Sequence, residues 1–258
     1  MVCYTSCWRI ILLKIDLHIH SSLSACGADE MSPFFILKQA LEKGLNIISI
    51  TDHNTIEHSL LACKISQKEN IKVIPGTELT TREEVHLLAY FDEVSALIEL
   101  DKLVNRLLPK IDNKPEFFGY QVLYDQHGDI FDLDNKLRQT AINIGLEQLV
   151  EEIHRLNGLA IPAHVDKNRF SLLRQLGFID EKSAFDAVEV SKYKWNKNKY
   201  QLGDTLFGFP VICGSDSHYP DDIGMFYMKT EDDRIMDCIS FKKYLKEKKH
   251  ENNSRSSI

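Results

Sequence analysis

The sequence predicts one α/β domain built from strand–helix units, and three observations support this prediction. Short apolar runs rich in β-branched residues alternate with segments of helical periodicity, which is typical of parallel βα units. The chain has 258 residues, 43% hydrophobic and 27% charged, which suffices for one sizeable core. Histidines and acidic residues follow the apolar runs. In a βα-barrel, this edge of the strands is where active sites are built.

Composition narrows the classes of partner. The formal charge of −7 gives no general attraction to nucleic acid or to an anionic membrane. We therefore expect no membrane partner and no stable nucleic-acid complex, although a local cationic pocket could hold a phosphate. The six scattered cysteines contain no Cys-x-x-Cys pair, which predicts free thiols and a cytoplasmic protein. Residues 1–13 are interpreted as an N-terminal extension, because their apolar run is too short for a signal peptide or a membrane span.

The first expected strand contains residues 15–20 and ends in His18 and His20. Side chains two residues apart in a strand share a face, so both imidazoles can bind one divalent ion. A His-x-His motif alone is a weak signal, because short motifs match often by chance. The interpretation therefore depends on whether later segments supply matching ligands.

The next units repeat the pattern. After a polar loop at 21–30, Ser32 and Pro33 predict the start of a helix that ends near Lys43. An apolar strand at 45–51 then delivers Asp52 and His53. A helix is expected at 56–70.

A hairpin is predicted next. A third strand at 71–77 ends at Glu78, and a fourth occupies 86–91. The link between them is too short for a parallel crossover, so the fourth strand should run antiparallel to the third. This hairpin would bring His86 to the same edge as Glu78.

The alternation of strands and helices is interrupted after a helix expected at 93–108. Residues 109–140 are a candidate insertion, with a hairpin expected around Gln126 to Asp129. A lid over a site and a surface excursion both remain open.

The second half returns to strand–helix units. His164 follows a strand at 159–163, and Asp216 and His218 follow a strand at 209–214. The other expected elements are helices at 146–157, 195–207 and 235–245, strands at 185–191 and 224–228, and a disordered tail at 246–258.

Five separate segments thus place His, Glu or Asp near the same edge of the predicted strands. Histidines buried for structural reasons alone would show no such placement, so we predict a metal site. The motifs resemble, in order and spacing, those of the PHP (polymerase and histidinol phosphatase) domain family of metal-dependent phosphoesterases over about residues 14–228. They are Asp16-Leu17-His18-Ile19-His20, Thr51-Asp52-His53, Pro75-Gly76-Thr77-Glu78, Val85-His86-Leu87-Leu88, Ala163-His164 and Ser215-Asp216-Ser217-His218.

The resemblance implies a distorted (β/α)7 TIM-like barrel at 14–245 with a small insertion, and two or three divalent ions (Mn, Zn or Fe). It further implies that a metal-bound hydroxide attacks the phosphorus in line, and that Glu78, Asp216 and His218 are catalytic through it. The implied ligands are His18, His20, Glu78 and Asp216 for one ion, Glu78, His86 and His164 for a second, and His53 and His218 for a third.

The chain departs from the family at one position. Nucleotide phosphatases of this family have an acidic ligand where this chain has Ala25. Cys26, Asp29 and Glu30 are nearby substitutes: a thiolate suits zinc or iron, and a carboxylate suits manganese or magnesium. A buried thiol and ordinary loop acids are equally compatible with the sequence.

Other polar residues have expected supporting roles. Lys167, Arg169 and Arg82 are candidates for binding phosphate, and solvated surface residues are the alternative for each. Asp16 and Asp52 are expected to orient imidazoles rather than to bind metal.

The function expected from the resemblance is hydrolysis of a phosphomonoester, or of the terminal phosphodiester of a small nucleotide or oligonucleotide. Histidinol-phosphate phosphatase is an alternative. A non-catalytic metal-binding regulatory module is another, motivated by Ala25. Loops such as 109–140 carry no motif that identifies the substrate.

Overall fold

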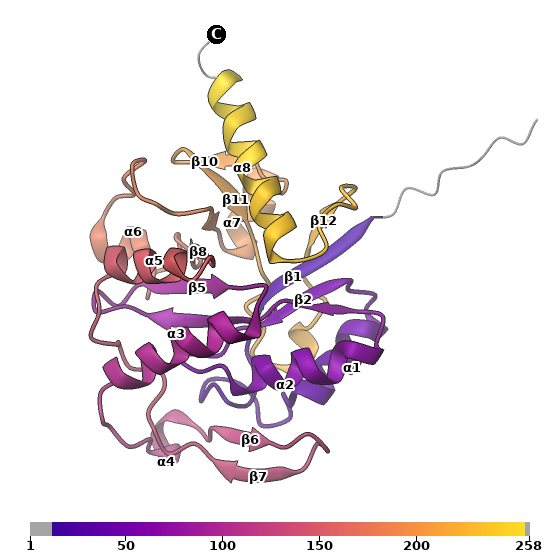
Figure 1. Cartoon of the computed structure of the whole chain (residues 1–258), viewed down its shortest axis with the longest axis vertical. Helices are drawn as coiled ribbons and strands as arrows, with labels where there is room; N and C mark the ends of the chain where they lie inside the picture. The colour runs from indigo at the N-terminus through magenta and orange to yellow at the C-terminus, as the bar shows by residue number, and fades with distance from the viewer. Residues whose placement is uncertain (1–11, 256–258) are drawn as a thin grey trace, which may run out of the picture.

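The computed structural model describes residues 12–255, in which strands and helices alternate as predicted (Figure 1). The strands are β1 (Leu13–Ile19), β2 (Ile47–Ile50), β3 (Lys72–Val73), β4 (Gly76–Thr80), β5 (His86–Tyr90), β6 (Val122–Tyr124), β7 (Ile130–Leu133), β8 (Leu159–Pro162), β9 (Val188–Glu189), β10 (Thr205–Leu206), β11 (Phe209–Ile212) and β12 (Met228–Thr230). The helices are α1 (Pro33–Glu42), α2 (Glu57–Ile65), α3 (Val94–Leu107), α4 (Pro115–Phe118), α5 (Leu146–Arg155), α6 (Leu172–Leu176), α7 (Lys192–Asn198) and α8 (Cys238–Arg255), with 3-10 turns at Ser66–Lys68 and Pro220–Asp222.

Within residues 12–255 the strands pair as four sheets, in the orders β12-β1-β2-β3, β4-β5-β8, β10-β11-β9 and β6-β7. β1, β2 and β3 are parallel, and so are β9 and β11. Backbone contacts join neighbouring sheets where the strands end. Ile19 bridges Ser217, His53 bridges Glu78, and the Val165 N–H donates to the Glu189 carbonyl at 2.8 Å. These contacts bring the polar strand ends together.

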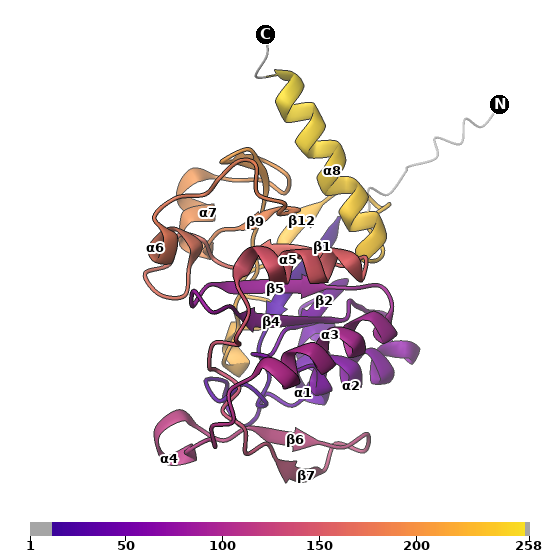
Figure 2. The same ribbon diagram turned by 60° about the vertical axis from the view of Figure 1, so that its left-hand side comes forward.

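β5 is buried on both faces and anchors the core. Leu87 and Ala89 pack in one apolar cluster with residues of α3 and α5, which flank the β4–β5 hairpin (Figure 2). Leu88 and Tyr90 point into a second cluster, where the Tyr90 hydroxyl donates to the Leu17 carbonyl at 2.8 Å. Burial of apolar surface on both faces is the dominant favourable term in holding such a strand. A third cluster lies between β1, β2 and helices α1 and α2.

The predicted hairpin between Glu78 and His86 is confirmed. β5 runs antiparallel to β4, with Glu78 opposite Leu88 and Thr80 opposite His86. The expected strand at 71–77 is instead two strands, because the chain changes partner at Pro75. β3 pairs with β2 and β4 pairs with β5. Proline has no N–H to donate, which makes it suitable at such a break.

Three expected elements have different bounds. The helix expected at 195–207 is α7, which ends because Lys199 adopts a left-handed φ of 55°. The strand expected at 185–191 is limited to β9, and the one expected at 224–228 begins only at Met228. In the last case, pairing with β1 sets the bounds.

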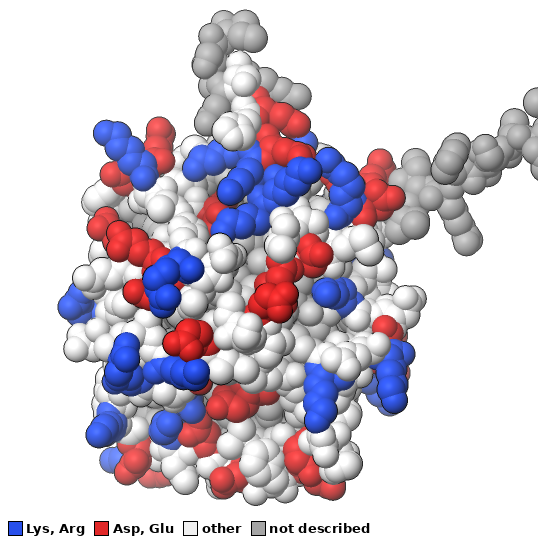
Figure 3. Space-filling view, in the orientation of Figure 1, with Lys and Arg blue, Asp and Glu red and all other residues white. Residues whose placement is uncertain are grey.

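The insertion at 109–140 contains the predicted hairpin, β6–β7, which lies at the end of the molecule opposite α8 (Figure 1). The prediction of a disordered tail from residue 246 is wrong as far as Arg255, because α8 continues to that residue. Its Lys and Glu residues favour helix, and Asn252 Nδ2 donates to the Gly203 carbonyl at 3.1 Å. Basic side chains gather over this helix (Figure 3).

Residues 1–11 of the expected N-terminal extension lie outside the described residues, as do Cys3 and Cys7. Cys26, Cys63, Cys213 and Cys238 are free thiols. No described helix is both long and apolar enough to cross a membrane.

Candidate metal centre

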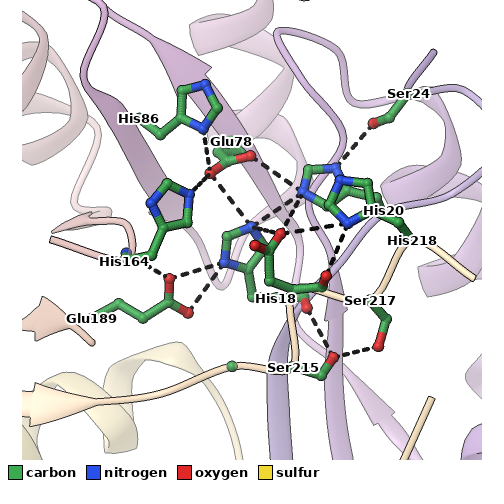
Figure 4. Close-up of polar contacts among 12 residues, drawn as sticks. His18, His20, Ser24, Glu78, His86, His164, Glu189, Ser215, Ser217 and His218 are labelled. Carbon is green, nitrogen blue, oxygen red and sulfur yellow. Dashed lines mark hydrogen bonds and ion pairs between the residues drawn. The ribbon is translucent and has the colours of Figure 1, made fainter. Parts of the chain in front are cut away.

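Glu78 lies fully buried among five histidines, and Figure 4 shows four of them, His18, His20, His86 and His164, around its carboxylate. It comes from β4. His18 lies on β1 and His20 directly after it, and the other histidines come from the segment after β2, from β5 and from the segment after β8. The distances are, for Glu78 Oε1, 3.0 Å to His86 Nδ1, 3.3 Å to His164 Nε2 and 3.4 Å to His18 Nε2, and for Oε2, 3.1 Å to His53 Nδ1 and 3.2 Å to His20 Nε2.

Asp216 supplies a second carboxylate from the segment after β11. Its Oδ1 lies 3.4 Å from His18 Nε2 and 3.3 Å from His20 Nε2, so both of these histidines lie between the two acids. His218 Nδ1 lies 2.8 Å from the Asp216 carbonyl oxygen. All eight predicted ligands therefore converge, and all except His18, which is buried behind the others, line one cavity of about 480 Å³.

Two of these residues have unusual backbone conformations. His164 has a φ of 30° and Asp216 a φ of 51°, in the left-handed region that non-glycine residues rarely occupy. Both follow strands, β8 and β11, at points where the chain turns sharply. Such backbone strain persists where the surrounding structure enforces it, and it concentrates at functional sites.

The cluster has the properties of a cation site. Four buried polar atoms make no hydrogen bond: both carboxylate oxygens of Glu78, His53 Nδ1 and His86 Nδ1. Each of the two histidine nitrogens nevertheless lies only 3.0 to 3.1 Å from an oxygen of Glu78. Buried polar atoms without partners are costly. Imidazole nitrogens and carboxylates are ligands for zinc, iron and manganese, so the residues fit divalent ions.

The charges point the same way. Burial favours the neutral form of Glu78, but the surrounding histidines, His86 first, hold its pKa well below the usual range. Burial opposes a charged His18, yet the carboxylates of Glu189, Glu78 and Asp216 raise its pKa well above the usual value. Burial lowers the pKa of His86 to about 4. The acids thus require positive charge, which protons supply here and which metal ions would supply in their place.

Glu189 is a functional candidate that the sequence interpretation missed. It ends β9, and its carboxylate lies 3.0 and 3.1 Å from His18 Nδ1 while accepting the His164 N–H at 2.9 Å. A carboxylate on the second nitrogen fixes the tautomer and ring orientation of a ligating histidine. The available signal was an acid inside an apolar strand, at the edge that carries the other candidates.

The expected roles of Asp52 and Asp16 differ in outcome. Asp52 accepts the Ser24 hydroxyl at 2.6 Å, and Ser24 Oγ lies 3.1 Å from His20 Nδ1, so Asp52 acts on an imidazole through a serine. Asp16 instead accepts the backbone N–H groups of His18 and Ser215. It therefore joins β1 to the segment after β11 and does not orient a ring.

The three candidate phosphate-binding residues lie in two different places. Lys167 and Arg169 line the cavity, and the Lys167 ammonium is ion-paired with Asp216. Arg82 lies elsewhere, in a different pocket lined also by Glu83 and Gly145. Among its two expected roles, this position of Arg82 on the β4–β5 turn favours a surface residue over a phosphate binder.

The three candidates in the loop after His20 lie in different places. Cys26 lines the cavity, whereas Asp29 and Glu30 are exposed. The cavity wall also includes residues that no motif indicated: Gln139, Asn168, and Phe170, whose ring stacks on His86 with centroids 4.7 Å apart.

Comparison with known proteins agrees with this geometry. An uncharacterised protein of Methanocaldococcus jannaschii is 28% identical over 160 residues, which are 55% of this chain and 94% of that protein. The lesion-specific endonuclease Q of Pyrococcus furiosus superposes with a TM-score of 0.60 at 20% identity over 82% of this chain, which spans only 50% of the endonuclease. A Bifidobacterium adolescentis protein assigned as a metal-dependent phosphoesterase superposes with a TM-score of 0.50 at 16% identity over 91% of this chain and 96% of that one.

The family comparison is the most direct. The PHP domain model matches residues 16–170, which are more than half of the chain and contain six of the eight converging side chains; Asp216 and His218 lie beyond the match. The predicted resemblance is confirmed: the chain belongs to the PHP domain family.

Proposed function

We propose that this chain hydrolyses a phosphate ester with two or three divalent ions held around Glu78. One observation carries the proposal: five histidine nitrogens lie between 3.0 and 3.4 Å from the two oxygens of a single buried carboxylate. No ordinary core requires such an arrangement, because a buried carboxylate with no hydrogen-bond partner is destabilising unless a cation compensates it.

The contacts suggest how the ligands divide. His18 and His20 lie between Glu78 and Asp216 and would hold one ion with them. His86 and His164 both approach Glu78 Oε1 and would hold a second ion. The remaining pair, His53 and His218, would hold a third. Ions bound here would lower the pKa of a coordinated water and neutralise charge on a phosphoryl group.

Lys167 and Arg169 would bind the phosphate. Lys167 already carries an ion pair to Asp216, and the Asp216 and other carboxylate charges keep its pKa above the usual value despite burial. It therefore stays charged. Arg169, exposed at the rim, can approach a phosphate with its planar fork.

We further propose a nucleotide or short oligonucleotide as the substrate. Lys167 and Asn168 also line a second hollow, beside α7, to which Tyr193, Lys194 and Lys197 contribute. Tyr193 is 71% exposed, and Lys197 Nζ lies 5.8 Å from its ring centroid. Lysines beside an exposed aromatic ring form the usual surface for a phosphodiester strand and its bases. The structural likeness to endonuclease Q, solved with a duplex carrying an abasic lesion, supports this choice.

Two finer features complete the proposal. The backbone bridges between sheets suggest that β1, β2, β4, β5, β8, β9 and β11 form the distorted seven-stranded barrel of the family. The insertion at 109–140 would act as a lid, because Gln139 at its end reaches the cavity wall.

The test is hydrolysis with manganese, zinc, iron or magnesium. It is measured as phosphate release from nucleoside monophosphates, histidinol phosphate and a generic aryl phosphate, and as nucleotide release from short oligonucleotides. We expect metal-dependent turnover, fastest on a nucleotide or oligonucleotide and lost in His53→Ala. Preferred turnover of histidinol phosphate would overturn the substrate assignment. Metal binding without turnover of any of these esters would indicate a binding module.

A further inference from the structure

We propose that the Cys26 thiolate is a ligand of the third ion and makes that position selective for zinc or ferrous iron over manganese and magnesium. The inference rests on the proposed metal-dependent function, but it concerns a residue that the family pattern does not supply. Its basis is a group of four side chains, His20, Cys26, His53 and His218.

The geometry of this group suits a four-coordinate ion. Cys26, His53 and His218 would supply three ligands and leave one position open, because His20 Nε2 faces Glu78 and Asp216, where the first ion would bind, and His20 Nδ1 faces Ser24. Cys26 Sγ and one nitrogen from each of the three histidines all lie within 4.8 Å of one another. Metal–ligand bonds of about 2.0 to 2.3 Å at tetrahedral angles place ligand atoms roughly 3.4 to 3.6 Å apart. Small side-chain rotations would bring the ligand atoms from their present separations to this spacing around one ion. All four side chains line the central cavity, so an ion can enter.

The loop backbone places Cys26, and not Ala25, at this point. Two consecutive turns form as the Ser24 N–H donates to the Ser21 carbonyl at 3.1 Å and the Gly27 N–H donates to the Ser24 carbonyl at 2.8 Å. A Cβ at Gly27 would lie 2.4 Å from the Ser21 carbonyl oxygen, so this path requires glycine. The Ala28 N–H then donates to the His218 carbonyl at 2.8 Å, which ties the loop to another member of the group.

The other candidates in this loop do not reach the group. Asp29 and Glu30 are exposed, and the Asp29 carbonyl accepts the Tyr124 hydroxyl at 3.2 Å, which holds that residue on the outer side. Cys26 is therefore the substitute for the acidic ligand that Ala25 cannot provide.

Ligand chemistry then predicts the metal. A thiolate is a soft ligand that favours zinc and iron, whereas magnesium and manganese favour carboxylate oxygens. Cys26 would bind the ion as the thiolate, since a coordinating thiol is deprotonated. Exchange of the thiolate for a carboxylate should therefore move the preference towards manganese.

The experiment loads the full chain with cobalt, as a spectroscopic substitute for zinc, and compares wild type with Cys26→Ser, Cys26→Asp and Cys63→Ser. Wild type and Cys63→Ser should show the thiolate-to-cobalt charge-transfer band in the near ultraviolet, and both Cys26 variants should lack it. Cys26→Ser should also bind one zinc ion fewer per chain. The zinc-to-manganese affinity ratio should fall at least roughly tenfold in Cys26→Asp, a change of about 1.4 kcal/mol.

A band of equal intensity in Cys26→Ser would overturn the inference, as would an unchanged zinc count. Cys63, a half-buried thiol on α2, is the matched control for loss of a cysteine, and a thermal melt verifies that each variant is folded. The two proposals fail separately. A Cys26-dependent band without ester hydrolysis would contradict only the proposed function, and hydrolysis without the band would contradict only the ligand assignment.

Discussion

The inner and outer sides of the candidate metal centre are built differently. On the inner side, His18, His20 and Glu78 are fully buried on β1 and β4, and Glu189 and Ser24 fix the two rings from behind. On the outer side, Cys26 and His218 lie on loops and are partly exposed. The comparison indicates a division of labour. We propose that the inner side holds the ions in one geometry and that the outer side determines which metal and which substrate are accepted.

The largest effect is expected when the inner side loses its shared carboxylate. Glu78→Gln keeps the shape but removes the charge that five histidines approach. We expect ester hydrolysis to fall about 1000-fold, because the ions stabilise the transition state by several kcal/mol and about 1.4 kcal/mol corresponds to tenfold. Steady-state rates and metal content measure this. Glu84→Gln, exposed in the same β4–β5 hairpin, is the control. Full activity in Glu78→Gln would refute the assignment of the inner side.

A smaller effect, a loss of metal affinity, is expected when Glu189, which lies behind His18, is changed. In Glu189→Gln, the side chain can still accept the His164 N–H, but it no longer places a negative charge beside His18 Nδ1. We expect metal affinity to fall roughly 10- to 100-fold, as is usual for partners of ligating histidines. Titration with a metal indicator measures the affinity. An unchanged affinity would mean that burial alone orients His18.

The inner side also predicts an opposite pH dependence of stability with and without metal. Without metal, neighbouring carboxylates, together with the Cys26 thiolate beside His53, raise the folded pKa values of His18, His20 and His53 despite burial. Their stabilisation is full below the unfolded value of about 6.5 and is lost as pH rises through the raised values. Bound ions require neutral imidazoles, so their stabilisation is lost as pH falls. Melting temperatures in chelator and in zinc should therefore diverge as pH rises. Parallel curves would contradict the charge assignment.

The smallest effects are expected at the rim. Arg169→Ala should raise KM about tenfold, because a hydrogen bond between charged groups contributes about 1.5 kcal/mol. Arg82→Ala is the matched control and should leave KM unchanged, since Arg82 lies in another pocket. Equal effects of the two substitutions would remove the distinction between the cavity rim and the remaining surface.

The same contrast explains what the sequence could predict. The alternation of elements, the Glu78–His86 hairpin and the convergence of the eight ligand candidates follow from strand periodicity and strand ends. Glu189 was missed because its role depends on β9 lying beside β8, a contact between segments distant in sequence. The continuation of α8 and the place of Arg82 likewise depend on packing that no local pattern encodes. For the loop at 21–30, the sequence could name Cys26 as a candidate but could not choose it over Asp29 and Glu30.

The most direct test of the central claim is anomalous X-ray scattering at the zinc edge from crystals of the zinc-loaded chain. The account predicts ions on both sides of the Glu78 carboxylate, one contacted by His18 and His20 and one by His86 and His164. Zinc located only at other surfaces, with the Glu78 carboxylate contacting no ion, would contradict it.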